Sequence, residues 1–175
     1  MVYLGIALGA ITLGFIWWNL SLDALWQPTD RATVRLILSL AGVKPGETVV
    51  DLGCGDGRIV VAAAREYNAY ARGVEIDPFR ALWGKTWIRL AGLSDRARIT
   101  WGDMYQFDLS AADVVVLFLS GKANQKLTRK LSRELRTGAR IVSYYHPLYD
   151  FAPVEVGRAK DGYPLYLYRM GVSDV

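Results

Sequence analysis

The sequence predicts an α/β protein with a doubly wound, mostly parallel sheet, a C-terminal antiparallel hairpin and an apolar helix that precedes the sheet. Short apolar segments alternate with segments of helical spacing, which is typical of a parallel sheet with helices on both faces. After the fifth apolar segment only a short Pro-containing stretch remains before the next. This stretch is too short for a crossover helix, so the last strands should be antiparallel. The first residues are free of charge and are expected to form the separate helix.

Each expected strand is a short run rich in apolar and β-branched residues. The runs at 48–52 and 113–119 are almost entirely apolar, which indicates strands buried on both faces. In chain order, the expected strands are residues 48–52, 70–75, 98–101, 113–119 and 139–144, followed by 154–156 and 165–169 as the closing hairpin.

The expected helices begin at capping residues and end at glycines. Asp30 and Asp77 are typical N-caps, and Pro78 suits the first helical position. Gly42 and Gly92 follow the last residues of helical spacing in their segments. In chain order, the expected helices cover about 31–41, 58–67, 78–91 and 122–136.

Residues 2–22 carry no charged side chain and would span roughly 31 Å as a helix, enough to cross a hydrocarbon core. Trp17 and Trp18 lie near its end, where an aromatic belt is expected. A signal peptide would need a basic residue before the run and a small-residue cleavage site after it, and neither is present. A buried or partner-binding helix is the other alternative. We therefore expect a membrane anchor at 1–22 and a separate folded domain at 23–175.

The charge pattern orients that anchor and limits the partners. All basic residues follow the apolar run, so the positive-inside rule predicts a single-pass membrane protein with its domain on the cytoplasmic side. A net charge of +4 suits an anionic membrane surface or acidic partners, but is too small to indicate nucleic acid. The single Cys54 excludes an intramolecular disulfide and a multi-cysteine metal site, and no metal is expected. The oligomeric state is not indicated.

A glycine-rich loop follows the first expected strand. Its glycines are spaced G-x-G-x-G rather than G-x-G-x-x-G, and Arg58 occupies the place of the third glycine of a dinucleotide-binding loop. Asp51 and Asp56 flank the loop and would repel a pyrophosphate. They suit a ligand with an ammonium group, such as the methionine end of S-adenosylmethionine, whose carboxylate would use free amides of the loop and the following helix.

Two later strands end in carboxylates that fit the rest of this ligand. Glu75 ends the second strand, 18 residues after Gly57, and is placed to accept hydrogen bonds from both ribose hydroxyls. Asp103 follows the third strand and would accept from the adenine amino group, with Met104 against the ring. Asp51 and Glu75 could instead be caps and the glycines mere turn formers. The order of loop, Glu75 and Asp103 at three successive strand ends favours the cofactor.

These residues resemble the motifs of class I, seven-strand S-adenosylmethionine-dependent methyltransferases, whose sheet is Rossmann-like. The resemblance covers about 27–169 and implies S-adenosylmethionine as the cofactor, although this chain lacks the last crossover helix of that class. The candidate cofactor-binding residues are Gln27, Thr29, Asp51, Gly53, Cys54, Gly55, Asp56, Gly57, Glu75, Ile76, Asp103, Met104 and Leu119.

A narrower resemblance concerns the methyl acceptor. Residues 26–29, 50–60 and 138–143 are similar to segments of archaeal protein lysine methyltransferases and of mitochondrial relatives that methylate ATP synthase subunit c and the adenine nucleotide translocase. The mitochondrial members also begin with an apolar membrane segment. The resemblance implies a lysine ε-amine on a membrane or membrane-adjacent protein. Trp26 and Gln27 depart from the Tyr-Val of that family.

The residues around the expected acceptor site agree with this interpretation in part. The strand at 113–119 is not followed by the Asn/Asp-Pro-Pro-aromatic motif of many enzymes that methylate base or glutamine amides, which disfavours those acceptors. Tyr144, Tyr145 and His146 follow the fifth strand and are the candidate catalytic or acceptor-lining residues. His146, the single histidine, is either a proton acceptor or a structural loop residue. A small or lipid-like acceptor and a non-catalytic cofactor-binding scaffold remain alternatives.

Overall fold

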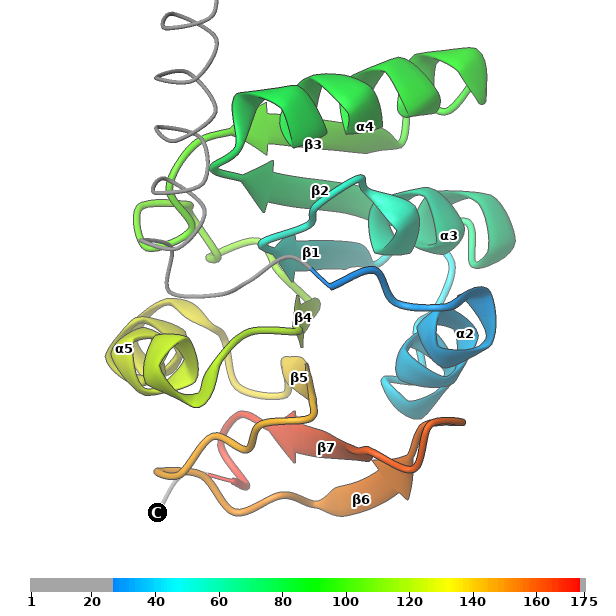
Figure 1. Ribbon diagram of the computed structural model, residues 1–175. Helices are drawn as coiled ribbons and strands as arrows, with labels where there is room; N and C mark the ends of the chain where they lie inside the picture. Colours follow the sequence, from blue (N-terminus) through cyan, green and yellow to red (C-terminus); the bar gives the residue numbers. More distant parts are fainter. Residues whose placement is uncertain (1–26, 174–175) are drawn as a thin grey trace, which may run out of the picture.

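The computed structural model describes residues 27–173, which form one seven-stranded sheet with helices on both faces (Figure 1). The strands are β1 (Thr48–Leu52), β2 (Tyr70–Glu75), β3 (Ala97–Trp101), β4 (Val114–Leu117), β5 (Arg140–Tyr144), β6 (Glu155–Arg158) and β7 (Pro164–Arg169). The helices are α2 (Arg31–Leu40), α3 (Arg58–Glu66), α4 (Pro78–Leu90) and α5 (Gly121–Glu134).

The sheet has the order β3-β2-β1-β4-β5-β7-β6. Strands β1 to β5 are parallel to one another, whereas β7 is antiparallel to both β5 and β6. The predicted doubly wound sheet with a closing hairpin is therefore confirmed. The carboxyl ends of the five parallel strands meet at one edge, on either side of the point where the order reverses between β1 and β4, which is where open α/β sheets bind ligands.

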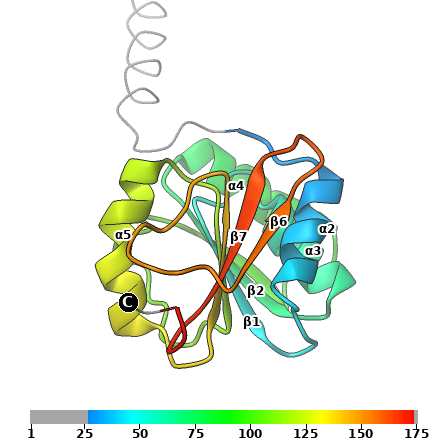
Figure 2. The same ribbon diagram turned by 90° about the horizontal axis from the view of Figure 1, so that it is seen from below.

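Two apolar cores lie on the two faces of the sheet. Helices α2, α3 and α4 contribute to one core, and α5 and the loop before β4 contribute to the other. Figure 2 shows α5 on one side of the sheet and α2 and α3 on the other. The helix starts follow the predicted capping. The Asp30 carboxylate accepts from the amides of Ala32 and Thr33, and that of Asp77 accepts from those of Phe79 and Arg80.

One strand differs from the prediction in a way that shapes the site. Strand β4 ends at Leu117, two residues earlier than the apolar run indicates. Phe118 and Leu119 leave the sheet and line cavities beyond its edge. An apolar run shows only that side chains are removed from water, and a cavity wall satisfies that condition as well as a strand does.

The predicted membrane anchor at 1–22 lies outside the described residues. Within residues 27–173, no helix is both long enough and apolar enough to cross a membrane.

Candidate active site

A cavity of about 260 Å³ lies at the carboxyl ends of β1, β2 and β4. Its walls come from the glycine loop, the ends of β2 and β3, the segment before α2 and the residues after β4. The predicted cofactor-binding residues that line it are Gln27, Thr29, Asp51, Gly53, Cys54, Gly55, Asp56, Glu75, Ile76, Asp103, Met104 and Leu119. The fold therefore brings together side chains that lie up to 92 positions apart in the sequence (119 − 27).

The glycine loop owes its shape to three residues with positive φ. Gly53, Gly55 and Gly57 have φ of +77°, +54° and +83°, a region that other residues rarely adopt. Gly57, unlike the other two, does not line the cavity. It is the N-cap of α3, and a Cβ there would lie 2.5 Å from Cδ1 of the buried Ile99. Its place is thus set by backbone conformation and packing.

Most amides of the loop already have partners within the protein. Gly53 and Cys54 both donate to the Val74 carbonyl at 3.0 Å, and Gly57 donates to the Cys54 carbonyl at 2.8 Å. The amide of Gly55 donates to Glu75 Oε2 at 2.8 Å. The expectation that free loop amides receive a ligand carboxylate is therefore wrong for these four positions. The reason is that β2 runs beside the loop and offers the Val74 carbonyl and the Glu75 carboxylate to three of these amides, while the fourth closes a turn within the loop.

Glu75 has two functions in the structure. Its carboxylate is buried, and besides Gly55 it accepts from the Asp77 amide at 2.9 Å, so it fixes the loop and the start of α4. Arg80 Nε lies 4.0 Å from Glu75 Oε1 and also pairs with Asp77. Glu75 still lines the cavity, and each carboxylate oxygen can accept more than one hydrogen bond.

Asp51 is the most electrostatically unusual residue of the cavity. It is 4% exposed at the end of β1, and burial together with the nearby carboxylates of Glu75 and Asp56 raises its pKa to about 8. Such a carboxyl is poised to ionise when a cation arrives. Burial and the nearby carboxylates, Asp51 foremost, also raise the pKa of the Cys54 thiol, which disfavours a nucleophilic thiolate there.

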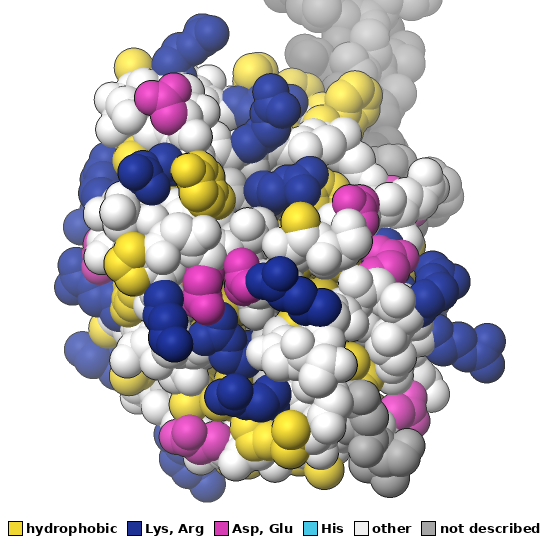
Figure 3. Space-filling view, turned by 180° about the vertical axis from the view of Figure 1, so that it is seen from behind, with side chains coloured by type: hydrophobic (Ala, Val, Ile, Leu, Met, Phe, Trp, Pro, Cys, Tyr) yellow, Lys and Arg dark blue, Asp and Glu magenta, His cyan; other side chains and the backbone are white. Residues whose placement is uncertain are grey.

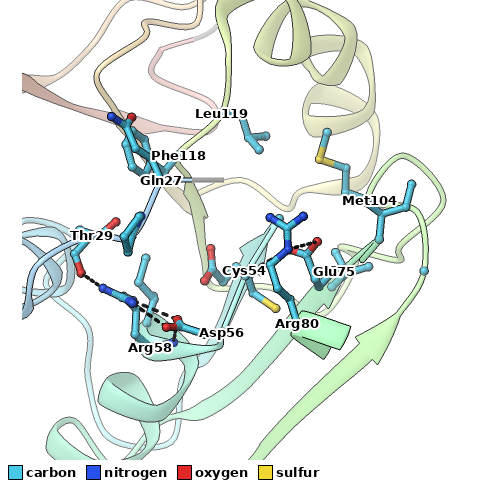
Figure 4. A pocket seen from close by; sticks show the side chains of 18 of the residues that line it. Gln27, Thr29, Cys54, Asp56, Arg58, Glu75, Arg80, Met104, Phe118 and Leu119 are labelled. Carbon is cyan, nitrogen blue, oxygen red and sulfur yellow. Dashed lines mark hydrogen bonds and ion pairs between the residues drawn. The ribbon is translucent and has the colours of Figure 1, made fainter. Parts of the chain in front are cut away.

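The Asp56 carboxylate is paired with Arg58, at the start of α3. It accepts from Arg58 Nε at 2.9 Å and lies 2.5 Å from Arg58 Nη2. Arg58 Nη1 donates to the carbonyl of Thr29, so the pair fastens the segment before α2 to the glycine loop. Figure 4 shows Arg58 between Asp56 and Thr29, and Arg80 beside Glu75 on another side of the cavity.

Several lining residues were missed by the sequence reasoning. They are Pro28, Arg58, Ile59, Val74, Arg80, Gly102, Tyr105 and Phe118. Among the residues that line this cavity, Arg58 and Arg80 are the cations. Arg58 directly follows the glycine loop and Arg80 lies three residues after the Asp77 cap, and these positions in the first turns of α3 and α4 are the signal that could have found them.

A second cavity of about 270 Å³ adjoins the first and shares four residues with it, namely Gln27, Pro28, Thr29 and Phe118. Its other lining residues are Asp30, Tyr144, Tyr145, Asp161 and Tyr163. The rings are packed in pairs, with centroids of Phe118 and Tyr144 4.4 Å apart and those of Tyr145 and Tyr163 4.5 Å apart. The Tyr144 hydroxyl donates to Asp161. Two of the three candidate catalytic residues therefore lie here.

His146 lines neither of these cavities. The chain turns sharply after β5, because Tyr145 has a φ of +73°. The His146 carbonyl then accepts from the side chains of Asn124 and Ser143, which holds this segment against α5. Of the two alternatives left open for His146, its position favours the structural loop residue.

The chemistry of the first cavity fits S-adenosylmethionine. A buried carboxyl with a raised pKa suits an ammonium group, the side chains of Glu75 and Asp103 offer acceptor oxygens, and Met104, Ile76 and Leu119 add apolar wall. Gly53 keeps the wall open, since a Cβ there would lie 3.0 Å from Leu119 Cδ2.

Comparison with known proteins agrees with the site. A family model described as the ANTKMT methyltransferase domain matches residues 51–155. A protein-lysine N-methyltransferase of Saccharolobus islandicus is 39% identical over 150 residues, which are 83% of this chain and 93% of the relative. The adenine nucleotide translocase lysine N-methyltransferase of Mus musculus is 37% identical over 78% of this chain, which spans 59% of that relative.

A solved structure extends the comparison to three dimensions. An RNA methyltransferase from Salinibacter ruber, in complex with S-adenosylhomocysteine, has a TM-score of 0.79 and 35% identity, and the match covers 82% of this chain and 94% of that one. Fold, cavity and relatives together make the chain an S-adenosylmethionine-dependent methyltransferase. More narrowly, it belongs to the family of the ANTKMT methyltransferase domain, and its predicted resemblance to protein lysine methyltransferases is confirmed.

Proposed function

We propose that this enzyme transfers a methyl group from S-adenosylmethionine to a lysine ε-amine of a protein. The observation that carries the proposal is the second cavity, which is lined by four aromatic rings and by the carboxylates of Asp30 and Asp161. None of the described residues that line it is Lys or Arg. Aromatic faces and carboxylates attract an alkylammonium group and repel phosphates, so this cavity suits a lysine side chain on its way to the cofactor.

For the cofactor we propose one contact for each strand end. Asp51 pairs with the ammonium group, Glu75 accepts from the ribose hydroxyls, and Asp103 accepts from the adenine amino group. Asp103 already accepts from the Tyr105 amide at 2.9 Å, which orients its carboxylate. Arg58, placed in the cavity wall by Asp56, is the candidate partner for the cofactor's carboxylate, since most loop amides are engaged elsewhere.

The bound cofactor supplies an electrophilic methyl group, and the protein must present a neutral amine to it. Deprotonation of a lysine with a pKa of about 10.4 at neutral pH costs roughly 4–5 kcal/mol, which a low-dielectric site reduces. Burial and the adjacent Asp161 raise the pKa of the Tyr144 hydroxyl, so Tyr144 remains protonated and does not act as the base. Tyr144 instead orients Asp161, and the amine loses its proton toward this exposed carboxylate and the solvent.

The membrane part of the proposal rests on the sequence. We propose that residues 1–22 form a single-pass anchor, that 23–175 form the catalytic domain on the cytoplasmic side, and that the substrate is a membrane or membrane-adjacent protein. The uncharged run over 2–22 and the basic residues after it support the orientation. An anchored enzyme meets membrane-bound lysines at a raised effective concentration.

Nucleic acid is the acceptor named for the Salinibacter relative, and it is the main rival. Two observations favour protein. The second cavity is lined by carboxylates, and Lys and Arg side chains on the face shown in Figure 3 are interspersed with Asp and Glu side chains.

The acceptor is tested with membranes from cells that lack the gene. The full-length enzyme and labelled S-adenosylmethionine are added, protein, lipid and RNA are separated, and modified peptides are sequenced by mass spectrometry. We expect label on lysine side chains of membrane proteins. Label in lipid or RNA without any modified lysine would contradict the lysine proposal, and no label in any fraction would favour a scaffold.

A variant of Asp161 tests the second cavity. Asp161→Asn should raise KM for the lysine acceptor by about five- to tenfold, because it removes a charge that attracts the ammonium group at a partly solvated site. Affinity for S-adenosylhomocysteine should not change, since Asp161 does not line the first cavity. Asp150→Asn is the matched control, because Asp150 is an exposed carboxylate that lines neither cavity. An unchanged KM in Asp161→Asn would show that lysine does not enter by this route.

A further inference from the structure

Helix α4 presents apolar side chains to the outside. Its buried residues are Ala81, Gly84 and Ile88, which face the sheet. On the opposite face, side chains at positions 79, 82, 83 and 90 follow helical spacing, where a surface helix of a soluble protein normally carries polar residues. Their exposed fractions are 72% for Phe79, 62% for Leu82, 68% for Trp83 and 82% for Leu90.

This apolar surface continues from α4 to the rim of the cofactor cavity. Ile76 and Trp101 are also exposed, and the Trp101 indole donates to the Ile76 carbonyl at 3.0 Å, which holds the ring beside the start of α4. With Phe79 they line a broad hollow of about 740 Å³. The hollow shares Ile76, Gly102 and Asp103 with the cofactor cavity. We call these six residues, Ile76, Phe79, Leu82, Trp83, Leu90 and Trp101, the α4 surface.

All charged side chains of helix α4 itself are positive. Over Pro78–Leu90 there are three basic residues, Arg80, Lys85 and Arg89, and no Asp or Glu. Lys85 and Arg89 are exposed beside the apolar side chains. Large apolar residues including Trp, flanked by Lys and Arg, are the composition of helices that lie in the interface of anionic membranes.

We propose that the α4 surface lies against the headgroup region of an anionic lipid bilayer. The charge complementarity favours lipid over a second copy of this basic chain. The position of the surface agrees, because the described chain begins at Gln27 in the wall of the cofactor cavity, five positions after the end of the segment proposed as an anchor. An anchored domain that rests on α4 keeps the rim of its cofactor cavity at the bilayer surface, where lysines at the edge of membrane proteins are found.

The test uses the full chain with a single fluorescent label. Cys54 is buried, so a cysteine introduced at an exposed position is the accessible thiol. Thr86 is exposed on the outward face of α4, and Glu155 is exposed on β6 at the opposite edge of the sheet. Thr86→Cys and Glu155→Cys are labelled with an environment-sensitive dye and reconstituted into vesicles of phosphatidylcholine and phosphatidylglycerol, with and without a lipid-borne quencher. Flotation verifies that the protein is on the vesicles.

We expect quenching at position 86 to be at least about threefold stronger than at position 155, and weaker in vesicles of phosphatidylcholine alone. In the mixed vesicles, Lys85→Glu combined with Arg89→Glu should reduce the quenching at position 86. The affinity for S-adenosylhomocysteine should not change. Equal quenching at the two positions would overturn the proposal. So would a label at 86 that neither lipid-borne nor aqueous quencher reaches, because protein would then cover the surface. The readout is independent of methyl transfer, so it can fail while the proposed function stands.

Discussion

Asp51→Asn is expected to abolish most of the cofactor affinity and at the same time to stabilise the free protein at alkaline pH. The carboxylate proposed to pair with the cofactor's ammonium group is almost fully buried. Loss of one member of a buried ion pair costs about 3–5 kcal/mol, which corresponds to an affinity loss of at least about 100-fold. Titration calorimetry with S-adenosylhomocysteine measures this effect.

The stability gain follows from the pKa of Asp51, which is about 8 in the folded protein against an ordinary value of 3.8. Because the folded pKa is raised, the carboxyl's contribution to stability is fully present below the unfolded value. This contribution is lost progressively as the pH rises from about 4 to about 8. In that range the Asp51 carboxyl is ionised in the unfolded chain but still protonated in the folded protein. Asparagine has no such loss, so the thermal midpoint of the variant should exceed that of the wild type most clearly at pH 8 and above.

Cofactor binding by the wild type should depend on the same ionisation of Asp51. The ammonium group pairs with the ionised carboxylate, so affinity should rise by up to about tenfold per pH unit as the pH approaches 8, and binding should release a proton. Asp95→Asn, at an exposed turn that does not line the cavity, is the control and should leave the profile unchanged. A flat profile for the wild type would show that Asp51 is not the partner of the ammonium group.

Gly84→Val is expected to destabilise the fold and weaken cofactor binding together. Gly84 lies on the buried face of α4, where a Cβ would approach the Asp56 carbonyl oxygen to 3.0 Å and Ile99 Cδ1 to 2.5 Å. Replacement of a helical glycine normally stabilises by up to about 1 kcal/mol, but overpacking of a tight core costs 1–3 kcal/mol or more. The steric effect should therefore dominate, and it acts directly on the backbone of the glycine loop.

Chemical denaturation and calorimetry on the same variants check this prediction. We expect Gly84→Val to lose about 3 kcal/mol of stability and Gly84→Ala to lose less, with affinity for S-adenosylhomocysteine falling in the same order. Thr86→Ala, two residues further on the outward face, should change stability by less than about 1 kcal/mol, because the gain in helix propensity offsets the loss of the Thr86 hydroxyl's hydrogen bond to the Leu82 carbonyl. A fully stable Gly84→Val with normal affinity would show that α4 does not bear on the loop.

The location of the cofactor cavity was predictable from the sequence, because it depends on periodicity and on strand ends. Apolar runs that alternate with helical segments define a parallel sheet, and the carboxyl ends of parallel strands share one edge. Asp51, Glu75 and Asp103 each end or follow such a strand, so their convergence required no knowledge of loop geometry.

The partners of those residues were not predictable in the same way. No spacing rule shows that Glu75 accepts from the Gly55 amide, 20 positions earlier, or that Arg58 reaches the carbonyl of Thr29, 29 positions earlier. The φ of Tyr145, which turns His146 away from the second cavity, is set by tertiary contacts such as the hydrogen bond of its amide to the Pro164 carbonyl. Such contacts between distant segments leave no periodic pattern in the sequence.

The segment 27–29 forms a wall common to both cavities, and this gives it a mechanical role. Pro28 is stiff, since its ring fixes φ, and the next residue is fastened by its carbonyl to Arg58, which in turn holds Asp56. Tension applied to the chain ahead of Gln27 would therefore act on the wall between the cofactor cavity and the second cavity before it acted on any strand. A force on the chain ahead of Gln27 would thus change the shape of both cavities while leaving the sheet in place.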